Sequence, residues 1–183
     1  MIPLTPSLLV AAANAFVGLG EDGGDNRGQM VELFLREVDQ KPGAPWCAAF
    51  VYHVGFWSHY EAAARKSSWP LLRTASCEEL GEYARKRGIS LRDPHVGDVF
   101  LKYSPDHGRF THTGIVATVC AVHRIGGDRD PHFLSECTTI EGNTNDDGSA
   151  NGYTTLRKER RFNSFVGDRF VRWPDVYLRA QAA

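Results

Sequence analysis

The sequence lacks an excess of charge of either sign. Its 183 residues carry 21 Lys and Arg against 22 Asp and Glu, so the formal net charge is −1. Attraction to nucleic acid through bulk electrostatics needs a basic footprint, which this balance does not supply. We therefore expect no nucleic-acid partner, although a local basic patch over Arg157–Arg161 stays open.

Long apolar runs and a leader pattern are also missing. No apolar run approaches the length that a transmembrane helix needs, so we expect no membrane span. The start, Met1–Thr5, has no basic residue, and the apolar run Leu8–Ala13 is short and is followed by Asn14, which does not fit a signal peptide. We expect synthesis in the cytoplasm without a signal peptide.

Closely spaced cysteine pairs are absent as well. The chain has four cysteines at wide spacings and no pair of the CxxC type: Cys47, Cys77, Cys120 and Cys137. This spacing disfavours a structural zinc site. Without a leader pattern, free thiols are expected rather than a disulfide framework.

The sequence pattern changes along the chain. Apolar residues recur at helical spacing in the first half, and β-branched residues alternate in the second. Helices are expected over residues 5–19, 29–38, 45–57 and 76–87, with a further turn or two over 61–65. Strands are expected over 97–103, 111–123, 133–142, 153–161 and 165–173. Helices followed by consecutive strands favour an α+β fold with an antiparallel sheet of about five strands, and no linker divides residues 1–183.

The stretch Pro42–Tyr52 is where chemistry is first indicated. Pro45 fits a first helical residue, which places Cys47 in the first turn of a buried helix. Unpaired N–H groups and the helix dipole favour an anion there, and a thiolate is a nucleophile. A small, buried core cysteine explains the same pattern. The stretch alone leaves both interpretations open.

Two other polar features are interpreted as structural. Ser76 with Glu79 forms a capping-box pattern at the start of a helix, and Cys77 in that helix occupies a core position. The acidic, glycine-rich loop Glu21–Gly28 could hold calcium, but its spacing is not that of an EF-hand. A tight turn that caps the next helix is the favoured interpretation.

A cysteine nucleophile needs a base, and the chain offers seven histidines. His112 stands at the entry of a strand expected to be central, and Gly114 on the same face leaves room for a close neighbour. We predict His112 as the base because a general base must be held rigidly. His107, in a turn, is the alternative.

The third group, which orients the base, is expected from the strand around residues 140–144. Glu141 and Asn143 point to one face of an extended chain, with Gly142 between them. Glu141 could accept a hydrogen bond from the imidazole, and Asn143 could do the same or hold Glu141 or the substrate. An ordinary polar pair at a strand end is the alternative.

Taken together, the segments Gly43–Val51, His112–Val116 and Ile140–Thr144 resemble the CHAP family, the cysteine, histidine-dependent amidohydrolases/peptidases of the papain-like superfamily. The loop over residues 20–28, the segment Gly97–Phe100 and the segment Phe170–Pro174 extend the resemblance over most of the chain. It implies a papain-like fold, with the helical half packed on the sheet, and a single catalytic domain over residues 1–183.

The resemblance also implies roles for individual residues. Cys47 would be the nucleophile, His112 the base, Glu141 the orienting group and Asn143 a supporting group. Trp46 could line the substrate groove, although a core position fits it equally well. No metal or cofactor is implied, because Asp39–Gly43, where some members carry an acidic calcium loop, holds one acid.

Family members usually cleave amide or peptide bonds of bacterial cell-wall peptidoglycan. We therefore expect a thiol amidase or endopeptidase that reaches the wall or periplasm by lysis or a secretion apparatus, with a possible immunity or delivery partner. The alternatives are a cytoplasmic amidase acting on a small peptide conjugate and a non-catalytic binding module with the same fold. We also expect Cys47 to titrate as a pair with His112, unlike the other three thiols.

Overall fold

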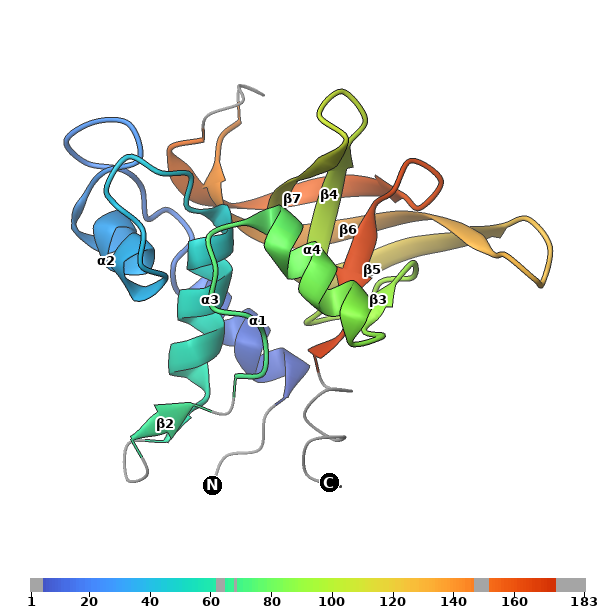
Figure 1. The fold of residues 1–183 in the computed structure, drawn as a ribbon, viewed down its shortest axis with the longest axis horizontal. Helices are drawn as coiled ribbons and strands as arrows, with labels where there is room; N and C mark the ends of the chain where they lie inside the picture. The colour runs from blue at the N-terminus through green and yellow to red at the C-terminus, as the bar shows by residue number, and fades with distance from the viewer. Residues whose placement is uncertain (1–4, 62–64, 68, 147–151, 174–183) are drawn as a thin grey trace.

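The first three helices lie at one end of the molecule, the fourth lies against the sheet, and the long curved sheet extends away from them (Figure 1). This computed structural model describes residues 5–61, 65–67, 69–146 and 152–173. The described helices are α1 (Pro6–Asn14), α2 (Gln29–Glu37), α3 (Cys47–Ser58) and α4 (Cys77–Lys86). The order of helices before strands confirms the α+β prediction.

Local signals in the sequence explain where the helices start. The side chain of Thr5 accepts a hydrogen bond from the N–H of Leu8, with Pro6 as the first residue of α1, and Ser76 caps α4 by accepting from the N–H of Glu79. Two boundaries differ from prediction. α1 ends at Asn14 in a series of turns, and α3 begins at Cys47, after Pro45.

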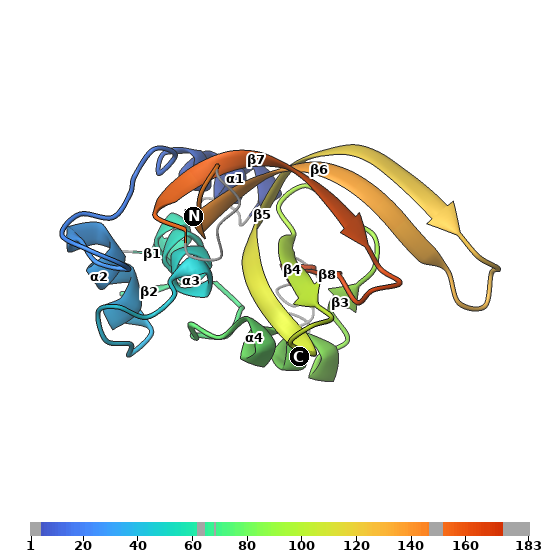
Figure 2. The ribbon, with the colours of Figure 1, turned by 90° about the horizontal axis from the view of Figure 1, so that it is seen from above.

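All the strand pairings are antiparallel. The large sheet has the order β3-β8-β4-β5-β6-β7 and therefore six strands rather than about five. Its members are β3 (Ser90–Leu91), β4 (Val99–Ser104), β5 (Arg109–Ile125), β6 (His132–Thr144), β7 (Thr154–Asn163) and β8 (Arg169–Val171). β5, β6 and β7 continue away from the helices as a curved ribbon (Figure 2).

A small hairpin stands near the place where a further helical turn was expected. β1 (Tyr60–Glu61) pairs with β2 (Lys66–Ser67), and residues 62–64 of that expected turn lie outside the described residues. No described helix is both long enough and apolar enough to cross a membrane.

Helix α3 is the central element of the helical layer. It packs against α1, α2, β5 and β6, so its residues from Cys47 to Val51 are all buried. Phe50 and Phe34 make edge-on ring contacts in this core. The arrangement places the start of α3 beside the strands that carry His112 and Glu141.

Candidate active site

Cys47 is the first residue of α3, as the sequence predicted for a residue in the first turn. Its side chain is buried, with only 4% of the residue exposed. The backbone N–H groups of a first helical turn have no acceptor within the helix, and their dipoles stabilise negative charge. A thiolate at this position is therefore favoured over one in a helix interior.

His112 lies on β5 and is hydrogen-bonded to Glu141 of the neighbouring strand, β6. Its Nε2 is 2.9 Å from Oε2 of Glu141, so Nδ1 is the ring nitrogen left for the Cys47 thiol. Gly114 makes this approach possible. A Cβ at Gly114 would lie 2.7 Å from the carbonyl oxygen of Ile140 and 3.0 Å from Cγ of Glu141.

The thiol and the imidazole stabilise each other in the charged forms. Burial opposes the imidazolium, but hydrogen bonds to Cys47 and Glu141 outweigh it and raise the pKa of His112 to about 9. The pKa of Cys47 is lowered well below its usual value by hydrogen bonds to Cys77 and His112 and by the backbone of Thr113, despite burial. Both shifts favour the thiolate–imidazolium form of the pair over the neutral form.

Glu141 is fully buried and its carboxylate is held by several donors. Arg160 donates from Nε to Oε1 (2.8 Å) and from Nη2 to Oε2 (2.6 Å), and the hydroxyl of Thr139 donates to Oε1 (2.5 Å). Burial alone would raise the pKa of Glu141, yet Arg160 and His112 hold it far below its usual range. A charged carboxylate thus faces the imidazole.

Arg160 is a site residue that sequence reasoning missed. It was considered only within the possible basic patch Arg157–Arg161. The available signal was its place on β7, the strand beside Glu141, because a buried carboxylate requires a cation or several donors.

Asn143 supports the site from a different direction than expected. Its backbone is left-handed (φ 54°), which Asn tolerates, and the pairing of β6 with β7 shifts register between Glu141 and Thr144. The alternation that predicted a shared face with Glu141 is therefore broken. With its amide nitrogen facing the carbonyl oxygen of Gly152 (2.5 Å), its oxygen accepts from the N–H of Trp46 (3.1 Å). Asn143 thus fixes the start of α3.

Cys77 is closer to the chemistry than its structural interpretation implied. It is the first residue of α4, and its Sγ lies 3.6 Å from Sγ of Cys47. The pKa of Cys77 is raised well above its usual value by this contact and by burial. The expectation that Cys47 titrates with His112 alone therefore has to include a second thiol.

Trp46 is a core residue, which is the second of the two interpretations. The side chain is fully buried, and its Nε1 donates to Oε1 of Glu21 (3.0 Å). Oε2 of the same carboxylate accepts from the N–H of Asn26 (2.8 Å). The acidic loop is thus a closed turn, although it does not cap α2 through a side chain, because the capping residue is Gly28. Within the described ranges, no cluster of three or more His, Cys, Asp or Glu could hold a metal ion.

His107, the alternative base, lies in the exposed turn between β4 and β5. Its Nδ1 is 2.9 Å from the hydroxyl of Ser104. A base must reach the thiol whose proton it takes, and the contacts described for Cys47 involve His112. The geometry therefore favours His112.

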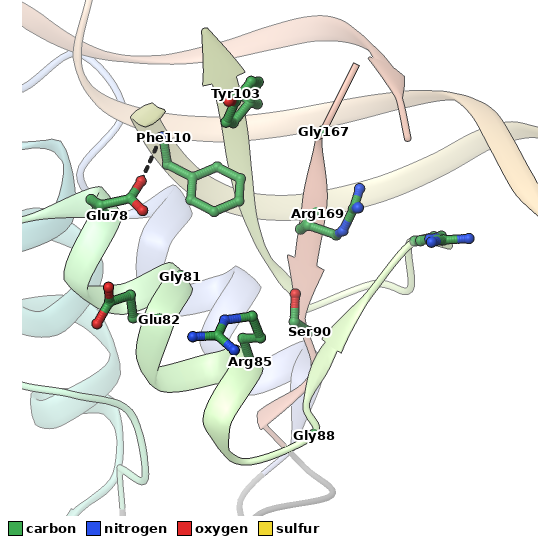
Figure 3. A pocket seen from close by; sticks show the side chains of 11 residues that line it. Glu78, Gly81, Glu82, Arg85, Gly88, Ser90, Tyr103, Phe110, Gly167 and Arg169 are labelled. Atoms are coloured by element: carbon green, nitrogen blue, oxygen red, sulfur yellow. Dashed lines mark hydrogen bonds between the residues drawn. The ribbon is translucent and has the colours of Figure 1, made fainter. Parts of the chain in front are cut away.

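A cavity of about 500 Å³ opens between α4 and the strands β3 and β8 (Figure 3), and its lining includes none of Cys47, Cys77 and His112. One wall is the helix face with Glu78, Glu82 and Arg85, and the opposite wall carries Phe110 and Arg169. Glu78 follows Cys77 directly and accepts a hydrogen bond from the N–H of Phe110 (2.8 Å). Along the chain, Glu78 and Phe110 are the lining residues nearest to the candidate site, because Phe110 precedes His112 by two residues on β5.

Comparison with protein-family models, with curated proteins and with solved structures found no match. What the site does must therefore be argued from its geometry.

The geometry suits attack by sulfur on a carbonyl carbon. Cys47 provides a nucleophile of lowered pKa, His112 a proton carrier in contact with it, and Glu141 a charge that orients the ring. As the first residue of α3, Cys47 has a backbone N–H outside the helix ladder that can donate to a developing oxyanion.

Proposed function

We propose that this protein is a thiol hydrolase that cleaves amide or peptide bonds through an acyl-enzyme on Cys47. The supporting observation is the connected, largely buried chain of Cys47, His112, Glu141 and Arg160. Each member stabilises the charged form of the next. A purely structural cysteine would require neither the imidazole nor the carboxylate behind it.

In the proposed reaction the Cys47 thiolate attacks the carbonyl carbon of the substrate. The oxyanion of the tetrahedral intermediate accepts a hydrogen bond from the backbone N–H of Cys47. The imidazolium of His112 then protonates the leaving amine, and the C–N bond breaks. Neutral His112 next removes a proton from water, which hydrolyses the thioester and restores the thiolate.

We propose peptides of bacterial cell-wall peptidoglycan as the substrate class and a papain-like arrangement as the fold. The support is the resemblance of the three segments around Cys47, His112 and Glu141 to the CHAP family, together with the α+β order of the elements. We further propose release to the wall by lysis or a secretion apparatus, with an immunity or delivery partner.

The proposal predicts defined products from purified walls. Incubating the protein with walls of known chemistry is expected to release peptides and to create new amino groups in a ratio of one per cleaved amide. Mass spectrometry of the muropeptides identifies the bond.

A digest without new amines or peptides contradicts the wall substrate, and release of an amine from a small peptide conjugate would then favour the cytoplasmic amidase. A Cys47 that iodoacetamide does not modify near neutral pH would favour a non-catalytic module.

A further inference from the structure

The cavity along α4 is lined by side chains of opposite charge. Glu78 and Glu82 line it toward the start of α4, and Arg85, Arg92 and Arg169 also line it. In Figure 3, Arg85 on α4 and Arg169 on β8 approach the cavity from opposite walls. Its volume, about 500 Å³, lies within the range of small-ligand sites.

Arg92 is paired with Asp130, whereas the guanidinium of Arg169 is hydrogen-bonded to no carboxylate in the described contacts. Its described hydrogen bonds run from Nη1 to two neutral backbone oxygens, of Ser164 (3.1 Å) and Asp168 (2.7 Å). The carboxylate of Asp168 faces elsewhere, because it accepts from Lys102 (2.6 Å) and from the N–H of Tyr103 (3.0 Å). Burial and repulsion from Arg92 lower the pKa of Arg169, against the attraction of Asp168 and Asp130. An anion in the cavity would relieve this repulsion.

We propose that the cavity binds a carboxylate of the peptide substrate, with Arg169 as its main partner and Arg85 as a second. A guanidinium binds a carboxylate through parallel N–H donors, which fixes geometry as well as charge. Glu78 and Glu82 disfavour a carboxylate toward the start of α4. The inference rests on the proposed function, because it treats the cavity as a subsite of the Cys47 reaction.

The length of α4 sets the position of this carboxylate along the substrate. Arg85 follows Cys77 by eight residues, or about 12 Å at the helical rise of about 1.5 Å per residue. An extended peptide covers about 3.3–3.6 Å per residue. Measured along α4, a carboxylate held by Arg85 would thus lie about three to four extended residues from the level of Cys77.

Walls whose carboxylates have been amidated with carbodiimide and ammonia test this subsite. We expect kcat/KM of the wild type to fall about 10-fold on amidated walls, because a charge-assisted hydrogen bond is lost. Arg169→Gln is expected to lose about 10-fold on untreated walls, mostly through KM, and to cleave both substrates equally. Arg85→Gln, on the exposed face of α4, is expected to reduce the discrimination about 3-fold without touching β8. Arg161→Gln, exposed and paired with Glu136, is the control.

Discrimination that persists in both Arg169→Gln and Arg85→Gln would overturn the subsite while leaving the proposed function intact. If the wild type does not cleave walls, calorimetric titration with a soluble stem peptide and its amidated form replaces the rate measurement. Preference for the free carboxylates that disappears in Arg169→Gln supports the subsite even then. Equal binding of the two peptides contradicts it.

A second inference comes from the two thiols at the helix starts. Cys47 and Cys77 each occupy the first position of a helix, and both are buried, so the dipole effect is similar for the two. The two thiols differ in their neighbours on β5. His112 and the backbone of Thr113 face Cys47. Arg109 is the charged group that acts on Cys77.

The geometry points to Cys77 as a protonated thiol that donates a hydrogen bond to the Cys47 thiolate. The separation of 3.6 Å between the sulfurs permits this bond, and Ser76 holds the start of α4 in place through the N–H of Glu79. Because only Cys47 carries a charge in this pair, the hydrogen bond from Cys77 lowers the free-energy cost of burying the Cys47 thiolate. This role requires no assumption about the substrate.

Alkylation by iodoacetamide, measured across pH in the presence of a phosphine reductant, tests Cys77 as the hydrogen-bond donor. Mass spectrometry identifies which cysteine is modified. Cys77→Ala and Cys77→Val are expected to move the midpoint for Cys47 up by about one pH unit, because a hydrogen bond to a charged group is lost. Cys77→Ser, which keeps a donor, is expected to remain within about half a unit of the wild type. Cys137→Ala, distant in the second core cluster, is the control. An unchanged midpoint in folded Cys77→Val overturns the inference, and circular dichroism checks the folding.

Discussion

Replacement of Cys47 by alanine is expected to abolish release of peptides from purified walls, by about 10⁴-fold or more. The thiolate is the atom that attacks in the proposed mechanism, and no neighbouring group can replace it. Cys77, 3.6 Å away at its sulfur, has a raised pKa and lacks the contact with the imidazole. The expected loss therefore concerns the chemical step rather than binding.

The same replacement is expected to leave the protein folded. Alanine has the highest helix propensity, and the change at the start of α3 removes a single sulfur atom. The melting temperature should stay within about 5 °C of the wild type. Cys120→Ala, an exposed thiol on β5, is the matched control and should retain full activity. More than a tenth of the wild-type activity in a folded Cys47→Ala protein would contradict the acyl-enzyme.

Replacement of Glu141 by glutamine has the second-largest expected effect. The amide keeps the shape of the carboxylate but removes its charge, so the His112 cation and Arg160 both lose their partner. We expect kcat/KM to fall about 10²- to 10⁴-fold, because the imidazole is no longer oriented and stabilised as a cation. We also expect a loss of about 2–4 kcal/mol in the free energy of unfolding, measured by urea denaturation.

The pH profile separates the electrostatic effect from a loss of folding. In the wild type the pKa of His112 is raised to about 9, so the imidazolium persists up to that pH and the alkaline limb of activity is expected there. Removing the Glu141 charge lowers this pKa, and the alkaline limb should move to lower pH. A merely destabilised protein would show an unchanged limb.

The sheet itself offers a matched control for Glu141. Glu136 is also on β6 and also pairs with an arginine of β7, Arg161 (3.0 Å), but this pair is exposed. Glu136→Gln should change the free energy of unfolding by less than about 0.5 kcal/mol, because surface ion pairs contribute little. Full activity in Glu141→Gln would move the orienting role to another group, and Asn143 would be tested next.

Local patterns were enough to predict the main elements and three members of the site. The Pro-rich break before Cys47 indicates a helix start, and Gly114 beside His112 indicates space for a neighbour; both effects act within a few residues. The placement of Glu141 on the next strand follows from the alternation of an extended chain. In the structure these three residues are connected, with Nε2 of His112 and Oε2 of Glu141 2.9 Å apart.

Where a residue departed from the regular pattern, the local prediction was wrong. Asn143 takes a left-handed backbone conformation at a shift in strand register, so it supports the N–H of Trp46 instead of sharing a face with Glu141. For Trp46 the local pattern left the groove and the core open, and the surrounding rings of α2 and α3 place it in the core. A local pattern holds no information about which distant segments enclose a side chain.

The sequence by itself therefore determined that Cys47 lies in the first turn of a helix, that His112 and Glu141 lie on strands, and that helices precede the sheet. Only the tertiary structure decided that Cys77 touches Cys47 and that Arg160 neutralises Glu141. These partners are 30 and 19 residues apart along the chain. Periodicity and capping act over a few residues, whereas a contact between two helix starts or across two strands depends on how the elements pack. Cys47 is a thiol at a helix start by sequence, and a thiolate held by two neighbours by tertiary packing.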